Sequence, residues 1–132
     1  MTMHIRRVDR DRLTPDNGLV AQRLIPWDVL NAPFEGSWCV VEPGASSGAH
    51  GHHEYEVWVA MTGAAEIITD SARVPFTAGD IVHFTPHERH QVVNHGDADF
   101  AMYALWWDAE LGEKFLDRHR ADAQAAPAEV AA

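Results

Sequence analysis

The sequence has a single cysteine, Cys39, and only half as many basic as acidic residues, 10 against 20. One cysteine excludes an internal disulfide, and its apolar neighbours Trp38 and Val40 predict a buried small side chain rather than a nucleophile. With a formal net charge of −10, the chain lacks the basic stripe that binds nucleic acid or an anionic membrane surface. No apolar run is long enough to span a bilayer, and residues 1–7 lack the apolar segment of a signal peptide, so we expect a cytoplasmic protein.

Short strands dominate what the sequence does contain. A length of 132 residues predicts one domain with its own core. Runs rich in β-branched and aromatic residues, separated by turn residues, predict strands at 19–24, 37–42, 55–61, 65–69, 73–76, 81–84, 90–95 and 100–107. Short strands at this regular spacing are typical of an all-β sandwich or barrel.

The two ends of the chain differ from this central part. Residues 1–18 form a polar arm, in which residues 3–8 are a possible edge strand, and the barrel occupies residues 19–108. Apolar residues at helical spacing predict one C-terminal helix at 109–121. We expect the alanine-rich tail, residues 122–132, to be disordered.

A cluster of potential metal ligands lies between Gly44 and Gly63. His50, His52 and Glu56 have the same parity, so one extended segment directs all three side chains to the same face. Two imidazoles and one carboxylate on one face form a facial set of ligands for a divalent metal ion. A fourth ligand, His90, could come from a second stretch at 79–94.

These residues resemble the motifs of the cupin superfamily. The first cupin motif is matched at every spacing by Gly44, His50, His52, Glu56 and Gly63. The second cupin motif is matched by Gly79, His90 and Asn94. Thr85 and His87 depart from it, because they stand where the family has proline and glycine, and we expect Pro86 to serve the turn.

The resemblance covers residues 37–107 and implies a double-stranded β-helix, the jelly-roll barrel of cupins. It implies that one divalent metal ion is bound by His50, His52, Glu56 and His90. The ligand types suit zinc or iron(II), and they leave nickel, copper and manganese open.

The alternation of side chains also predicts which residues line the pocket beside the metal. Trp58 shares a face with Glu56, while Val92 and Asn94 share a face with His90. In the strand at 100–107, either the even-numbered or the odd-numbered residues face inward; we favour the odd-numbered set. The predicted substrate-binding residues are therefore Trp58, Val92, Asn94, Tyr103 and Trp107.

Two residues are candidates for catalysis. Tyr103 would bring a phenol to the site if the odd-numbered set faces inward. Glu54 has the same parity as the ligands and is a candidate general base, although an exposed position at the rim is the alternative.

Three functions are compatible with this sequence. The first is a metal-dependent enzyme that rearranges a small organic molecule; residues 102–108 resemble the zinc cupins of hydrazine-forming biosynthesis. Those cupins form an N–N bond from an O-acyl hydroxylamine ester made by a methionyl-tRNA-synthetase-like partner. The second is a mononuclear iron(II) dioxygenase, and the third is a non-catalytic binding or sensing module. The family resemblance also implies a homodimer.

Overall fold

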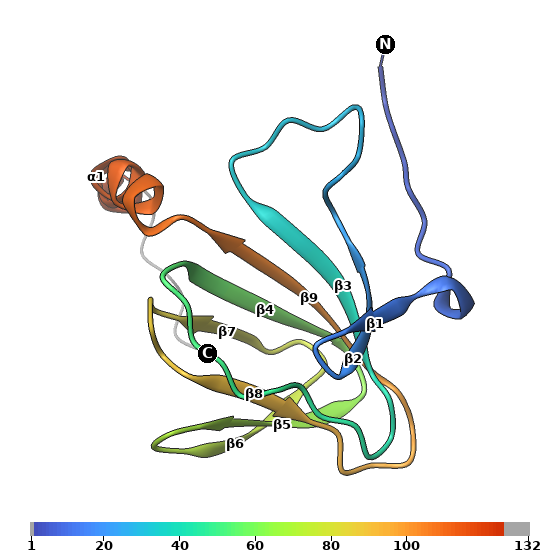
Figure 1. Cartoon of the computed structure of the whole chain (residues 1–132). Coiled ribbons are helices and arrows are strands. Elements are labelled where there is room, and N and C mark those ends of the chain that lie inside the picture. Colours follow the sequence, from blue (N-terminus) through green and yellow to red (C-terminus); the bar gives the residue numbers. More distant parts are fainter. Residues whose placement is uncertain (1, 126–132) are drawn as a thin grey trace.

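The computed structural model describes residues 2–125, which form two facing antiparallel sheets and one α-helix (Figure 1). The strands are β1 (Thr14–Asp16), β2 (Leu19–Arg23), β3 (Glu35–Val41), β4 (Tyr55–Thr62), β5 (Ala64–Thr69), β6 (Arg73–Thr77), β7 (Ile81–Phe84), β8 (His90–Val93) and β9 (Phe100–Trp107). The larger sheet has the order β1-β2-β3-β9-β4-β7, and the smaller has the order β6-β5-β8. The prediction of a mostly β fold with one C-terminal helix is confirmed.

The core lies between the two sheets, and its aromatic side chains come from both. Trp58 of β4 packs edge-on against Phe84 of β7, with ring centroids 4.8 Å apart. Phe76 of β6 packs against Phe100 of β9, with centroids 5.6 Å apart. Alternation along β4 buries every second side chain, as expected for a strand with one face on the core. This alternation is what turns Glu56 toward the interior.

The larger sheet aligns the interior side chains of its strands in rows. One row contains Glu35 of β3, Trp106 of β9, Glu56 of β4 and Phe84 of β7. The next row contains Arg23 of β2, Ser37 of β3, Ala104 of β9, Trp58 of β4 and Val82 of β7. Residues that face each other across neighbouring strands point to the same side of the sheet. These rows therefore form one wall of the space that contains the metal ligands.

The N-terminal arm differs in detail from the prediction. Residues 3–8 form no strand, and the edge strand of the arm is instead β1, which pairs with β2. Asn17 and Gly18 connect the two strands with positive φ angles of 52° and 82°, the signature of a tight type I′ hairpin. The arm is attached by Arg6, whose guanidinium lies 4.8 Å from the centre of the Trp27 ring. Arg6 also donates hydrogen bonds to the carbonyls of Arg23 and Leu24.

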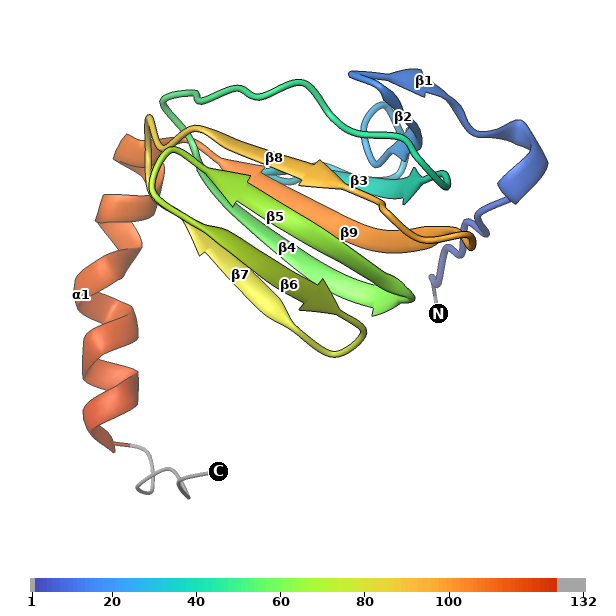
Figure 2. The same ribbon diagram turned by 90° about the horizontal axis from the view of Figure 1, so that it is seen from below.

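The C-terminal helix, α1 (Ala109–Ala125), extends away from the sheets, as Figure 2 shows. Asp108 caps it by accepting hydrogen bonds from the backbone N–H groups of Glu110 and Leu111. The helix ends four residues later than predicted, so residues 122–125 are helical rather than disordered. The rest of the predicted tail, residues 126–132, lies outside the described residues.

Candidate metal centre

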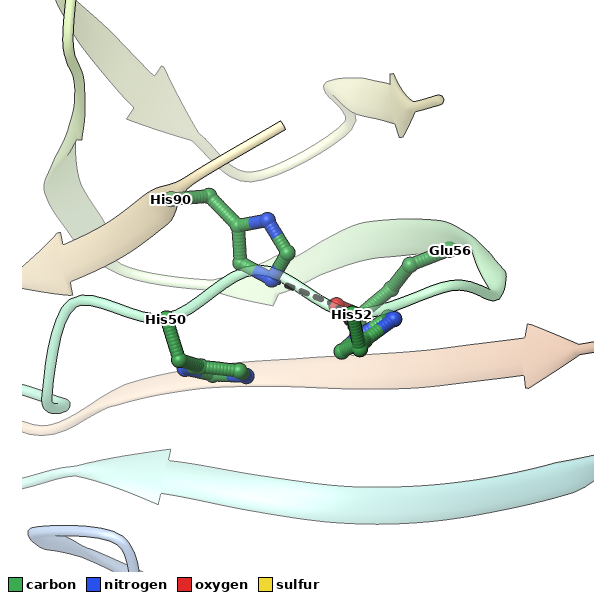
Figure 3. A group of neighbouring side chains, drawn as sticks. All are labelled: His50, His52, Glu56 and His90. Carbon is green, nitrogen blue, oxygen red and sulfur yellow. Dashed lines mark hydrogen bonds and ion pairs between the residues drawn. The ribbon is translucent and has the colours of Figure 1, made fainter. Parts of the chain in front are cut away.

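Four potential metal ligands converge at one end of the space between the sheets (Figure 3). His50 and His52 lie on the segment that leads into β4, Glu56 belongs to β4, and His90 begins β8. One ligand atom from each side chain lies within 4.8 Å of the other three. Zinc binds nitrogen and oxygen ligands at about 2.0–2.2 Å, so no two ligand atoms of one ion lie more than about 4.4 Å apart, and the four atoms are near the spacing that a single ion requires.

Backbone hydrogen bonds fix the segments that carry the histidines. His50 and His90 exchange N–H to carbonyl bonds of 3.2 and 3.0 Å, which places the two strands of the motif side by side. The N–H of His87 donates to the carbonyl of His52 at 2.6 Å. His87 has a φ of 71°, the left-handed conformation for which the family has glycine at this position. His87 therefore adopts the turn conformation that glycine adopts in the family, and its presence does not disrupt the turn.

The hydrogen bonds of the imidazole rings determine which nitrogen can bind a metal. Nδ1 of His90 lies 2.9 Å from the carbonyl of Glu88, and a carbonyl only accepts, so Nδ1 carries the proton. Nδ1 of His50 lies 3.1 Å from the carbonyl of Gly48; the Asn17 amide is farther away, at 3.4 Å, so we assign the proton by the shorter contact. In both rings Nε2 is then the nitrogen that can offer a lone pair to a metal ion. This is the form in which histidine binds metals.

The Glu56 carboxylate faces these rings and is itself buried. Its Oε1 lies 2.7 Å from Nε2 of His90 and 3.2 Å from Nε2 of His52. Burial raises the pKa of Glu56, but the contact with His90 and the nearby His52 lower it more, so the pKa lies below its ordinary value. The carboxylate is therefore charged at neutral pH.

The pair formed by His90 and Glu56 favours a cation between them. Nε2 of His90 is buried and has no hydrogen-bond partner among the described residues, although the carboxylate oxygen is close. A contact of 2.7 Å between these two atoms requires a cation between them, either a proton on Nε2 or a metal ion that both groups bind. Three imidazoles and one carboxylate are compatible with one divalent metal ion, and they do not select between zinc and iron(II).

A cavity of about 390 Å³ opens beside the ligands. Its wall combines apolar side chains of the larger sheet with polar groups from β1, β2 and β3. Trp58 and Val92 line it, as the sequence predicts. Met102, Ala104 and Trp106 also line it, and they belong to the even-numbered set that was the alternative for this strand. The lining residues that sequence reasoning did not identify are Asp16, Asn17, Leu19, Ala21, Arg23, Ser37, Cys39 and Ser47.

The preference for the odd-numbered residues of β9 is wrong. Met102, Ala104 and Trp106 line the cavity, whereas Tyr103 lies on the opposite face of the sheet, paired with Trp38 of β3. The reason is register: Trp106 is directly opposite Glu56, so the even-numbered residues share the face of the ligands. Tyr103 is therefore removed from the candidate catalytic and substrate-binding residues.

Trp107 also lies outside the cavity. Its ring stacks with those of Tyr55 and His83, at centroid distances of 5.9 and 6.2 Å, on the outer face of the larger sheet. These rings line a second cavity of about 530 Å³ against α1. It is the larger of the two cavities, but none of the four ligands lines it, so we assign the candidate site to the smaller one.

The remaining predicted residues have clear positions. The Asn94 amide nitrogen donates to the carbonyls of Val41 and Ala98, both at 2.8 Å, and its oxygen accepts from the N–H of Gly96. These bonds use the whole side chain to hold a loop, so Asn94 does not line the cavity. Glu54 lies beside the cluster, with its carboxylate 4.0 Å from Nδ1 of the ligand His52; it is partly exposed and does not line the cavity.

Two facing antiparallel sheets with a cluster of three histidines and one glutamate define a small double-stranded β-helix protein with a potential metal site. The chain belongs to the cupin family: a family model described as "Cupin domain" matches residues 37–107. Among residues 2–125, no helix is long and apolar enough to cross a membrane.

Solved structures show the same relationship. A cupin 2 conserved barrel domain protein from Salinispora arenicola is 61% identical, with a TM-score of 0.79, over 90% of this chain and 100% of that one. A protein from Photorhabdus luminescens is 37% identical, with a TM-score of 0.78, over 90% of this chain and 99% of that one. A sugar phosphate isomerase of the cupin superfamily from Silicibacter pomeroyi is similar in fold alone, with 21% identity and a TM-score of 0.64 over 79% and 76% of the two chains.

Proposed function

We propose that this cupin is a metal-dependent enzyme that rearranges a small organic molecule, and that its substrate is an O-acyl hydroxylamine ester, from which it forms an N–N bond. The observation that carries the proposal is the cluster of His50, His52, Glu56 and His90, in which Glu56 and His90 are buried, beside a cavity of about 390 Å³. Side chains that could serve as ligands are typically buried and mutually close only where an ion or substrate compensates their desolvation. The cavity volume suits a ligand of metabolite size.

A divalent ion held by these four residues would supply Lewis acidity and a fixed template for the ester. The chain itself supplies the orientation of the ligands, through the proton on Nδ1 of His90 and the hydrogen bond to the Glu88 carbonyl. The apolar wall formed by Trp58, Val92 and Met102 excludes water, which would otherwise hydrolyse the ester.

The proposed rearrangement is balanced without an external oxidant. The amine nitrogen of the acyl group attacks the hydroxylamine nitrogen, so that the N–N bond forms as the N–O bond breaks. The oxygen leaves with the bonding pair as a carboxylate, the attacking nitrogen is oxidised, and the hydroxylamine nitrogen is reduced. The attacking amine loses a proton, and we assign Glu54 as the base that accepts it; because Glu54 lies beside His52 and does not line the cavity, the proton would pass through one water molecule.

The proposal includes a partner that makes the ester. A methionyl-tRNA-synthetase-like enzyme in the cytoplasm would join an amino acid to an N-hydroxylated amine and pass the labile product to this cupin. We also propose that the protein is a homodimer and that it binds neither nucleic acid nor a membrane surface. The excess of acidic residues, 20 against 10 basic ones, disfavours binding to such negatively charged partners.

The second candidate is a mononuclear iron(II) dioxygenase. The ligand set includes two histidines and one carboxylate, which is the ligand combination of many non-haem iron(II) oxygenases. The two candidates differ in their metal and in their need for oxygen, so the same preparation tests both.

The experiment is an assay of synthetic O-acyl hydroxylamine esters with the zinc-loaded and the iron-loaded protein, in air and under argon. We expect oxygen-independent formation of the hydrazine, slowed strongly by Glu54→Gln and not by the surface control Glu42→Gln. Substrate-dependent oxygen uptake with the iron form, and no hydrazine, would favour the dioxygenase. Absence of any turnover from a metal-loaded protein would favour the binding module.

A further inference from the structure

We infer that the metal cavity contains a subsite for a carboxylate of the substrate, formed by Arg23 with Ser37. Because the cavity is taken as the active site, this inference rests on the proposed function and adds the chemical class of the substrate to it. Both residues line the cavity that three of the four ligands, His50, His52 and Glu56, also line, and neither belongs to the cupin metal motif.

Register places the two residues together on the wall of the cavity. Arg23 of β2 is directly opposite Ser37 of β3, in the row that continues to Ala104 of β9 and Trp58 of β4. Side chains directly opposite each other in antiparallel strands have neighbouring Cβ atoms. Ala104 leaves room in the middle of this row, so a ligand can lie between the Arg23 end and the metal ligands.

The Arg23 guanidinium is held in position but retains donors for a ligand. Nε and Nη2 of Arg23 contact the Asp16 carboxylate at 3.0 and 3.4 Å, and the guanidinium lies 5.1 Å from the centre of the Trp106 ring. Within residues 2–125, no hydrogen bond is made by Nη1, which carries two N–H groups. Trp106 is directly opposite the metal ligand Glu56. The Arg23 guanidinium that stacks on Trp106 therefore lies on the part of the cavity wall nearest to Glu56.

Ser37 supplies an independent observation. Its side chain is 3% exposed, and Oγ is buried without a hydrogen-bond partner in the described part of the chain. A buried hydroxyl without a partner costs free energy, so such a group is typically retained where a ligand or an ordered water satisfies it. Rotation about the Cα–Cβ bond of Ser37 brings the hydroxyl toward a ligand oxygen near Arg23.

The charges in the cavity favour a carboxylate over a phosphate. A planar guanidinium matches a planar carboxylate, which accepts two parallel hydrogen bonds. Asp16 and Glu56 are already negative groups in the same wall, and they disfavour a dianion more than a monoanion. Asp16 already balances the charge of Arg23, so the subsite offers directed hydrogen bonds without surplus positive charge, which suits a monoanion better than a dianion.

The test is calorimetric titration of the cobalt(II)-loaded protein with malonate, succinate and glutarate. One carboxylate of each probe would occupy the Arg23 subsite while the other reaches the metal, so we expect an affinity optimum at one chain length. Arg23→Gln should weaken binding of the best probe by about tenfold to a hundredfold, the range for a charge-assisted hydrogen bond. Arg73→Gln is the matched control, because Arg73 makes a similar cross-strand ion pair, with Glu66, on the other sheet.

Ser37→Ala should weaken binding severalfold and, unlike a merely structural change, raise the melting temperature, because it removes a buried hydroxyl without a partner. Arg23→Met keeps the packing of the stem and serves if Arg23→Gln does not fold. Equal affinity of the wild type and the folded Arg23 variant would overturn the inference, as would tighter Arg23-dependent binding of inorganic phosphate than of succinate.

The cobalt absorption spectrum separates this inference from the proposed function. Failure of the protein to bind cobalt would contradict the proposed metal enzyme. The same titrations would then be repeated with the metal-free protein. Dicarboxylate binding that depends on Arg23 would still support the subsite. Binding that does not depend on Arg23 would overturn the inference.

Discussion

Replacement of His52 or His90 by alanine should remove the metal in both cases but affect the stability of the metal-free protein differently. The His52 side chain is 24% exposed, whereas that of His90 is 1% exposed. His90 stacks on Phe84, with ring centroids 4.3 Å apart, and meets the edge of Trp58 at 5.2 Å. His90 is therefore both a ligand and part of the core.

The magnitude follows from two effects of the same sign. Truncation of a large buried side chain to alanine costs about 2–5 kcal/mol. Loss of the imidazole also removes the contact of 2.7 Å with the buried Glu56 carboxylate, which leaves that charge without its nearest partner. We therefore expect His90→Ala to lower the free energy of unfolding by about 3 kcal/mol, and His52→Ala to change it by less than about 1 kcal/mol.

Urea unfolding in the presence of a chelator measures these values, and the metal content of each variant measures ligation. A typical domain has about 5–15 kcal/mol of stability, so both variants should fold. Full metal content in either variant would contradict the ligand assignment. Equal unfolding free energies of the two metal-free variants would contradict the packing assigned to His90.

Four further predictions concern the surroundings of the site. Gly18→Ala should cost more than about 2 kcal/mol of stability, because φ is 82° and the added Cβ would collide with the Ser46 carbonyl. Gly44→Ala should cost about 1 kcal/mol, because φ is a similar 78° but the added Cβ meets open space. Urea unfolding of the two variants measures the difference. Burial raises the pKa of the Cys39 thiol to about 11, so native protein at pH 8 should resist iodoacetamide and urea-unfolded protein should react. The stability contributed by the neutral Cys39 thiol should be complete below about pH 8.5 and lost as the pH rises toward about 11, in comparison with Cys39→Ala; equal pH profiles would contradict this. Tyr103→Phe should leave metal content and ester turnover unchanged, because Tyr103 lies on the face away from the cavity, and a loss of turnover would contradict that placement.

The metal ligands were predictable because their arrangement is mostly local. His50, His52 and Glu56 lie within one extended segment, where parity alone determines the face, and His90 lies at a motif position of the partner strand. The hairpin of β1 and β2 was also within reach, since Asn17-Gly18 is a strong signal for a two-residue turn. It marks the edge strand that we instead expected at residues 3–8.

Other features depend on long-range register, which composition does not determine. Both faces of β9 carry large apolar residues, so only its pairing with β4 decides that Trp106 rather than Tyr103 shares the face of Glu56. The positions of Arg23 and Ser37 likewise follow from the pairing of β2 with β3. The end of α1 was missed because no glycine or proline follows Arg120 until Pro127, so the sequence contains no stop signal there.

Elemental analysis of the protein, purified without oxygen and without added metal, tests the central claim most directly. We expect close to one divalent ion per chain, bound by the three histidines and Glu56, and its loss in His52→Ala. Zinc would support the rearrangement of O-acyl hydroxylamine esters, and iron would support oxygenation. A folded wild-type protein that contains no metal and binds none when zinc or iron(II) is added would contradict the account.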